Sequence, residues 1–234
     1  MDTMLSYLSK YLAEPKVLPA LRADDPLMSE LPQWWREILL VKSADRIHEA
    51  LHAWEGYRAQ LPSVFDFLST HLRSVNLLTD KNLVTEQTSV RLLYELEKDG
   101  RTMYYAGGNP LRKSMAASVR DIWGKLPADF RRFYDYFHNG WYCLASRSMG
   151  PSASEDFFLL HDLEWGILDD IGDPGCDLKD LLAVYTNGMG GYVALSINRK
   201  GACGDVLWWK DKPPRFNIDA WAIMDAWTEI GLNK

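Results

Sequence analysis

The sequence predicts an α+β protein with a mostly antiparallel sheet flanked by helices and an all-helical N-terminal extension. Two kinds of periodicity predict this class. In the first 85 or so residues, apolar side chains recur at spacings of three and four, which is typical of helices with one buried face. From Ser89 onward, short alternating segments are separated by glycine-containing turns, which indicates strands. Helices and strands in mixed order are typical of α+β proteins.

Composition is typical of a soluble globular protein. Hydrophobic residues make up 47% of the 234-residue chain and charged residues 25%, a balance that fills a core and argues against disorder. The longest uncharged run, residues 181–198, contains three glycines and several polar residues, so we expect no membrane-spanning segment. Residues 1–10 lack the basic and then apolar pattern of a secretory signal.

The cysteines indicate a reducing compartment. Cys143, Cys176 and Cys203 are odd in number and far apart in the sequence. This spacing excludes a disulfide framework and any C-x-x-C metal or redox motif. We therefore expect a cytoplasmic protein.

The N-terminal part is expected to be a series of short helices broken by prolines. Apolar side chains at helical spacing cover residues 34–39, 47–57 and 65–72. Residues 1–87 are therefore assigned to a helical N-terminal extension, and residues 88–234 to the α+β domain.

A β-hairpin is expected after Ser89, where the spacing of the apolar residues changes from three or four to two. Apolar and polar residues alternate from Val90, and Asp99-Gly100 is a turn that joins this strand to residues 101–105. A helix follows at residues 114–123. A second helix has Pro127 in its first turn and ends at Asn139-Gly140.

The remaining elements are short strands and one helix. Strands are expected at residues 141–144, 157–160, 181–185, 192–197 and 206–209, and a helix rich in aromatic residues at 219–230.

The glycine-rich turn at residues 186–191 has two interpretations. Gly188, Gly190 and Gly191 supply positive φ where the chain turns tightly into a strand. As a phosphate loop, the run would lack its third glycine, because position 193 is Val, and it would precede a strand where a helix is required. The structural interpretation is therefore favoured.

Acidic residues are concentrated in one segment. The net charge is −6, but residues 155–180 hold nine carboxylates against one base, Lys179. Such a surface repels nucleic acid and anionic membranes and attracts cationic partners. The carboxylates are those of Glu155, Asp156, Asp162, Glu164, Asp169, Asp170, Asp173, Asp177 and Asp180.

One segment, His48-Glu49-Ala50-Leu51-His52, fits the H-E-x-x-H pattern of zinc enzymes. Two histidines four residues apart face one way on a helix and could bind Zn²⁺, while Glu49 could accept a proton from metal-bound water. Both histidines lie outside the apolar face of the expected helix. This position is compatible with a zinc site and equally with a solvated helix surface. No third histidine follows at the usual spacing, so a solvated face is favoured and a zinc metalloenzyme is the alternative.

Short motifs in the C-terminal half carry a family resemblance. They are Leu126-Pro127 opening a helix, Asn139-Gly140-Trp141 closing it, Asn187 to Tyr192 entering a strand, Val206 to Trp209, and a last helix with Trp221, Asp225 and Trp227. This set resembles the SUKH superfamily, which includes the yeast cell-wall-assembly regulator and many bacterial immunity proteins. The resemblance covers about half of the chain. It implies a sheet flanked by helices, no catalysis, no cofactor, and a protein that neutralises a toxin made by its own or sister cells.

The acidic segment is the expected contact with that partner, a cognate bacterial toxin, for which a nuclease with a basic active-site cleft is one candidate. Trp dominates the binding energy of many interfaces, so Trp165 is the expected apolar anchor, and a core position is its other interpretation. We expect no catalytic residue, no metal, and neither nucleic acid nor membrane as a partner. The expected partner-binding residues are Asp162, Glu164, Trp165, Asp169, Asp170, Asp173 and Asp177.

Overall fold

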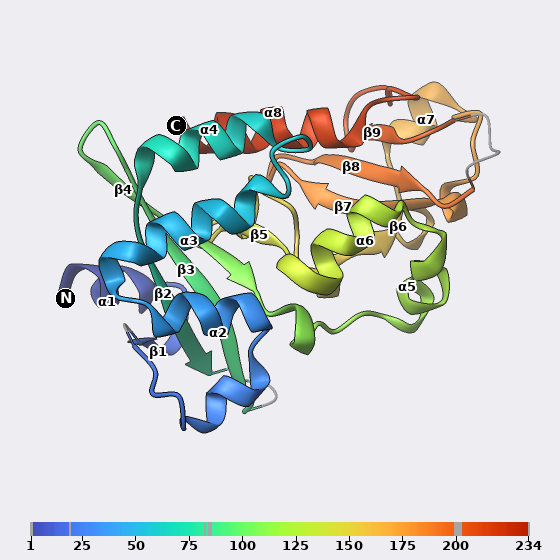
Figure 1. The fold of residues 1–234 in the computed structure, drawn as a ribbon. Coiled ribbons are helices and arrows are strands. Elements are labelled where there is room, and N and C mark those ends of the chain that lie inside the picture. Colours follow the sequence, from blue (N-terminus) through green and yellow to red (C-terminus); the bar gives the residue numbers. More distant parts are fainter. Residues whose placement is uncertain (1, 19, 82, 84–85, 199–202, 234) are drawn as a thin grey trace.

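The computed structural model describes residues 2–18, 20–81, 83, 86–198 and 203–233. It confirms the α+β class, because helices surround two antiparallel sheets (Figure 1). The α-helices are α1 (Asp2–Leu8), α2 (Gln33–Leu40), α3 (Ser43–Glu55), α4 (Pro62–His71), α5 (Ala117–Ile122), α6 (Ala128–Arg132), α7 (Ile167–Ile171) and α8 (Ala220–Leu232). In the described part of the chain, no helix is long and apolar enough to cross a lipid bilayer.

The first sheet has the strand order β1-β2-β3-β4-β5, and each neighbouring pair is antiparallel. The predicted hairpin is confirmed as β3 and β4, and its turn residues Asp99 and Gly100 both have positive φ, as a two-residue type I′ turn requires. The strands are β1 (Ala13–Leu18), β2 (Leu72–Lys81), β3 (Thr88–Lys98), β4 (Arg101–Gly108) and β5 (Trp141–Cys143).

The expectation of an all-helical segment at residues 1–87 is corrected by β1 and β2. The helices α2, α3 and α4 form where they were predicted, but β2 begins at Leu72, directly after α4. No glycine or proline separates the two elements, and His71 in the last turn of α4 is only a weak helix stop signal. Pro15 lies in β1, an edge strand that tolerates a missing backbone N–H, and the register shifts beside it.

The sheet also continues across the predicted domain boundary. Strand β2 pairs with β3 along most of its length, from Leu72 opposite Leu96 to Lys81 opposite Thr88. The division between residues 87 and 88 therefore falls in the connection between two paired strands.

The second sheet has the order β6-β7-β8-β9 and is also antiparallel. Helix α8 contacts both α4 and β8, so the C-terminal helix joins the N-terminal helices to this sheet; Figure 1 shows α8 (red) beside α4 (cyan). The strands are β6 (Phe158–Leu159), β7 (Leu181–Thr186), β8 (Gly191–Ser196) and β9 (Val206–Trp209).

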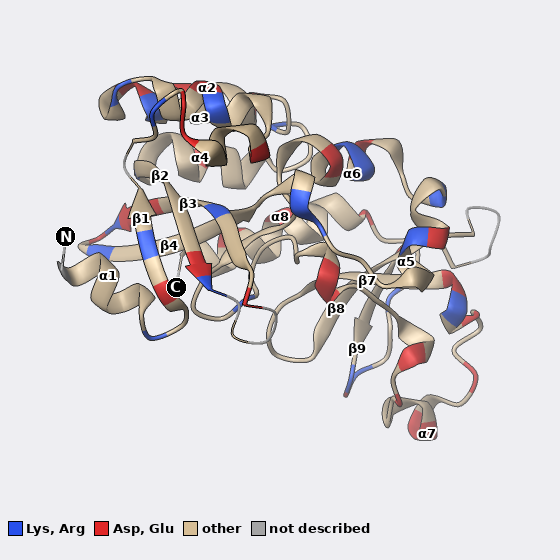
Figure 2. Cartoon of the chain, turned by 90° about the horizontal axis from the view of Figure 1, so that it is seen from below, with Lys and Arg blue, Asp and Glu red and all other residues tan. Residues whose placement is uncertain are grey.

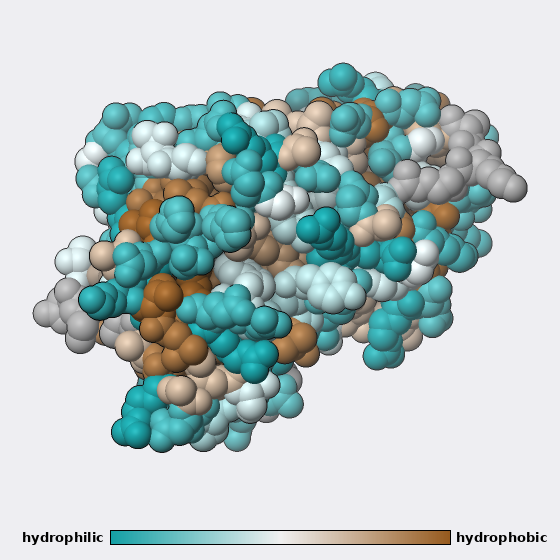
Figure 3. Space-filling model, viewed as in Figure 1, coloured by the Kyte–Doolittle hydropathy of each residue, from teal (hydrophilic) through white to brown (hydrophobic). Residues whose placement is uncertain are grey.

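One hydrophobic core runs through both sheets. It includes Trp54 of α3, Leu92 of β3, Val184 of β7 and Met224 of α8, all with no exposed surface. The outer face of the helical layer is mixed: Figure 3 shows apolar areas separated by hydrophilic side chains. Leu40 of α2 is 55% exposed, which is ordinary for a single apolar side chain on a folded protein.

His138 is fully buried at the centre of an aromatic cluster. The ring of Phe137 lies 4.4 Å from the imidazole, between ring centroids, and the rings of Trp34 and Trp35 lie at 5.2 and 5.7 Å. Tyr94 Oη is 2.8 Å from His138 Nε2 and accepts a hydrogen bond from Trp54 Nε1 at 3.3 Å. Burial lowers the pKa of His138 to about 3, so the imidazole is neutral near pH 7.

Candidate functional site

The predicted partner-binding segment lies at the opposite end of the molecule from α1 (Figure 1). It comprises a 3-10 turn at Leu160–Asp162, helix α7, the connection after it, and a second 3-10 turn at Leu178–Asp180. Six predicted carboxylate residues are exposed along this segment. They are Asp162, Glu164, Asp169, Asp170, Asp173 and Asp177.

Of the two roles expected for Trp165, apolar anchor or core residue, the structure shows the core residue. Its side chain is 7% exposed, and its Nε1–H donates to the carbonyl oxygen of Leu160 at 2.6 Å. The indole packs edge-on against Trp208 and Tyr192, with ring centroids 5.5 and 5.6 Å away. Trp165 therefore fastens the acidic segment to the second sheet and does not lie on the surface where an apolar anchor would be.

Three carboxylates are held by their own backbone. Asp162 accepts the N–H of Leu159 at 3.0 Å, Asp173 accepts the N–H of Gly175 at 2.8 Å, and Asp177 accepts the N–H of Lys179 at 2.9 Å. In each case one oxygen accepts this bond, and the exposed carboxylate can still contact a partner. These groups are presented in defined positions before any partner arrives.

Few cationic side chains neutralise the negative charge of the acidic segment. Among the described residues, no lysine or arginine forms an ion pair with its six exposed carboxylates, and His161 lies 3.0 Å from Asp162. Figure 2 shows acidic residues in and around α7, at the end of the molecule away from the N-terminus. A concentration of uncompensated charge attracts a cationic surface over a range of about 8 Å at physiological salt.

An exposed apolar side chain also lies in this segment. Leu163 is 48% exposed and stands between Asp162 and Glu164. Its exposure had no sequence signal, because a single leucine between two acids is as often a core residue. With Trp165 buried, Leu163 is the apolar side chain that the acidic surface presents.

The structure does not complete the H-E-x-x-H motif into a metal centre. His48 and His52 are exposed on α3, and Glu49 is half-buried. Within the residues that the structure describes, no group of three or more His, Cys, Asp or Glu side chains is placed to hold a metal ion.

The glycine-rich turn joins β7 and β8. Gly188 and Gly190 have the expected positive φ, whereas Gly191 does not. The Asn187 side-chain oxygen accepts the N–H groups of Met189 and Gly191 at 2.8 and 2.9 Å. A strand follows the turn, so this geometry fits the structural interpretation and not a phosphate loop at a helix N-terminus.

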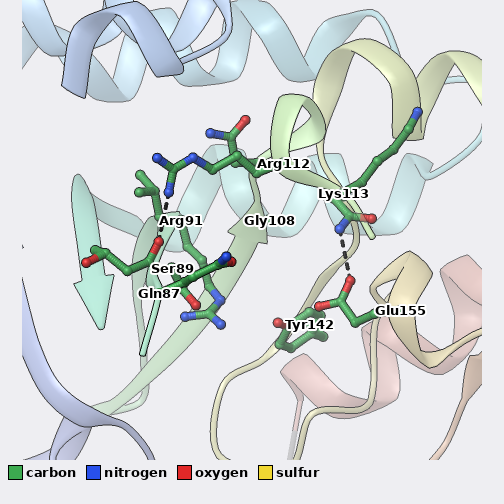
Figure 4. Close-up of a pocket in the computed structure, with 12 residues that line it drawn as sticks. Gln87, Ser89, Arg91, Gly108, Arg112, Lys113, Tyr142 and Glu155 are labelled. Carbon is green, nitrogen blue, oxygen red and sulfur yellow. Dashed lines mark hydrogen bonds between the residues drawn. The ribbon is translucent and has the colours of Figure 1, made fainter. Parts of the chain in front are cut away.

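A polar cavity of about 670 Å³ opens where β3 and β4 meet the turn at Pro110–Arg112. Figure 4 shows Arg91 and Arg112 on one side of it and Glu155 on another. Each cation is already paired: Arg91 with Asp80, Arg112 with Glu30, and Lys113 with Asp135. Because these ion pairs neutralise the cations, the described residues of the cavity lining offer no uncompensated positive charge to an anionic ligand. The paired residues are distant in sequence and could not be grouped from it.

Two cysteines that are far apart in the sequence line one cavity beside the acidic segment. Cys176 and Cys203 line a cavity of about 200 Å³ beside the acidic segment. Their 27-residue separation follows no cysteine motif, so the proximity is a product of the fold.

Comparison of the chain with family models, curated proteins and solved structures gave no match. The resemblance to the SUKH superfamily therefore stays a prediction based on the short motifs after Leu126.

Proposed function

We propose that this chain is a non-catalytic immunity protein that binds a cognate protein toxin in the cytoplasm and covers its basic active-site cleft. The single observation that carries the proposal is the row of exposed carboxylates on α7 and the turns beside it, which the described lysines and arginines leave uncompensated. The resemblance of the C-terminal motifs to immunity proteins of the SUKH superfamily points to the same class of function.

The acidic surface has the properties of a preformed binding site. Trp165 fixes the segment to the sheet, and the side-chain oxygens of Asp162, Asp173 and Asp177 are fixed by backbone hydrogen bonds. Groups that are ordered before binding lose less conformational entropy on association. Leu163 gives the surface an apolar side chain, which an interface needs for its desolvated centre.

The charge arrangement supports recognition of a basic cleft. Complementary charges across an interface accelerate the encounter and select against partners of the same sign. A basic cleft that binds an acidic substrate, such as a nucleic acid, would meet a row of negative groups on this surface. Covering the cleft inhibits the partner without any chemical step on the immunity protein.

The test is a native pull-down followed by a growth assay. Tagged protein is purified from its source cells, and the bound partner is identified by mass spectrometry. Expression of that partner alone should arrest growth, and co-expression of the wild-type chain should restore it. Asp169→Asn, Asp170→Asn and Asp173→Asn together should weaken both capture and rescue.

A matched control removes the same charge elsewhere. Asp45, Asp66 and Asp99 are exposed on α3, α4 and the β3-β4 turn, so their combined change to Asn lowers the negative charge equally at the other end of the molecule. This control should capture the partner and rescue growth like the wild type. Equal behaviour of the two triple variants, or a partner that does not arrest growth, would contradict the proposal.

A further inference from the structure

Two sulfur atoms meet beside the acidic segment. Cys176 lies in the connection after α7, and Cys203 lies before β9. The Cys203 thiol donates to the carbonyl oxygen of Gly175 at 3.3 Å, and Gly175 directly precedes Cys176. The Cys176 thiol and the Cys203 side chain are also hydrogen-bonding neighbours. The two thiols are therefore close to each other before any chemistry occurs.

The two cysteines pack against a hydrophobic cluster on one side and line a cavity on the other. Both side chains pack against the hydrophobic cluster that contains Trp165 and Trp208. Both are half-buried and line the same cavity, so neither residue is sealed in the core. The third cysteine, Cys143, lies in β5 of the other sheet, away from this cavity.

We propose that Cys176 and Cys203 are a redox-responsive pair that forms a reversible disulfide by exchange with a low-molecular-weight disulfide such as oxidised glutathione. One protein thiol loses its proton and attacks a sulfur of the small disulfide, which releases the first small thiol. The second protein thiol loses its proton and attacks the mixed disulfide, which releases the second. Two protein thiols are oxidised to one disulfide, and one small disulfide is reduced to two thiols.

The surroundings of Cys176 affect its reactivity in these two steps. Burial raises the pKa of Cys176 to about 12, and the hydrogen bond to Cys203 and the nearby Asp173 and Asp177 add to the rise. Because only a thiolate attacks a disulfide, this raised pKa slows attack by Cys176 on the small disulfide.

The disulfide would link the acidic segment to the chain before β9. Cys176 lies between Asp173 and Asp177, so closing the bond restrains the loop that carries both carboxylates. The shared cavity and the hydrogen bond from Cys203 to Gly175 support this pairing, and it does not depend on the partner proposed above.

The test uses the full-length wild-type protein equilibrated with mixtures of reduced and oxidised glutathione, quenched with acid, alkylated and digested. We expect a peptide pair cross-linked through Cys176 and Cys203, with Cys143 alkylated, and loss of two of the three alkylatable thiols. Addition of reduced glutathione in excess should restore both thiols. Residues 172–177 should become more resistant to proteolysis in the oxidised form.

Cys143→Ser is the matched control and should form the same cross-link as the wild type, whereas Cys203→Ser should retain a free thiol or a mixed disulfide at Cys176. Persistent alkylation of Cys176 and Cys203 in the wild type would overturn the inference. A stable mixed disulfide at both positions, or a cross-link that includes Cys143, would overturn it as well.

Discussion

The Asp225 carboxylate on the C-terminal helix accepts the backbone N–H of Val64 at 3.1 Å, across 161 residues of sequence. Its second oxygen accepts the N–H of Ser63 at the same distance. Helix α4 begins after Leu61, which has no side-chain oxygen, so Asp225 takes the place of a local N-cap. The N-terminal helices and the C-terminal helix are thus joined by a buried, charge-assisted contact.

Replacing Asp225 with Ala should lower the free energy of unfolding by about 1–3 kcal/mol, because two N–H groups at a helix start lose a buried partner. Urea denaturation followed by circular dichroism measures the change. Asp66→Ala on the same helix is the control, since Asp66 is exposed, and it should change stability by less than about 0.5 kcal/mol. Equal effects of the two substitutions would show that the Asp225 contact contributes nothing.

Residues 88–234 alone should not fold cooperatively. Without residues 1–87, β3 would have an unpaired edge, and the faces of β3 and α8 that α4 contacts would be uncovered. We expect the fragment to lack a cooperative urea transition and to associate through the exposed strand. A sharp transition in a monomeric fragment would show that the N-terminal strands and helices are dispensable.

The buried ring of His138 leaves no room for a side chain at position 107, which is glycine. A Cβ at this position in β4 would overlap the imidazole of His138, whereas one at Gly124 would meet no atom within 4 Å. Gly107→Ala should therefore destabilise the protein by about 1–3 kcal/mol through overpacking. Gly124→Ala should be within about 1 kcal/mol of the wild type. Thermal unfolding of both variants makes the comparison, and equal melting temperatures would refute the close packing of Gly107 against His138.

Acid should weaken the fold through His138. The folded-state pKa is about 3 against 6.5 for an unperturbed histidine, so between these values the unfolded chain binds a proton that the folded protein does not. The stability contributed by the neutral imidazole is fully present above pH 6.5 and falls toward pH 3, by up to about 1.4 kcal/mol per pH unit. In His138→Gln this part of the pH dependence should disappear, although the variant is less stable throughout. An unchanged pH profile of unfolding would mean that His138 binds its proton at the same pH in the folded and unfolded states.

The elements that could be predicted from sequence have local signals. Asp99-Gly100 fixes a hairpin turn through two positive φ values. Pro127 and Asn139-Gly140 flank a helical segment made of α6 and the π-helical turn at Phe133–Phe137, and Gly140 has the positive φ that a glycine after a helix supplies. Strand β2 lacked such a signal. Its first residue, Leu72, follows the last turn of α4 directly, and its identity as a strand comes from pairing with β3. The strand character of residues around Pro15 likewise depends on an edge position that only the folded sheet defines.

Some features of the candidate site could also be predicted from local sequence, and others depend on residues that are distant in the sequence. The acidic character of residues 155–180 is a property of composition, and the exposure of its carboxylates follows from their high desolvation cost. Whether Trp165 faces solvent or core depends on Trp208, which is 43 residues later, so no local pattern could decide it. The meeting of Cys176 with Cys203 depends in the same way on how two connections pack on the second sheet.

The central claim, that the acidic segment recognises a basic partner, is tested most directly by association kinetics over a range of salt concentrations. The partner recovered by pull-down is mixed with wild-type protein and with the combined Asp169→Asn, Asp170→Asn and Asp173→Asn variant in stopped-flow experiments. We predict that the association rate of the wild type falls steeply with added salt, and that the variant associates about tenfold more slowly at low salt, with a smaller change in its dissociation rate. An association rate and salt dependence equal to those of the wild type, in a variant with an intact fold, would contradict the account.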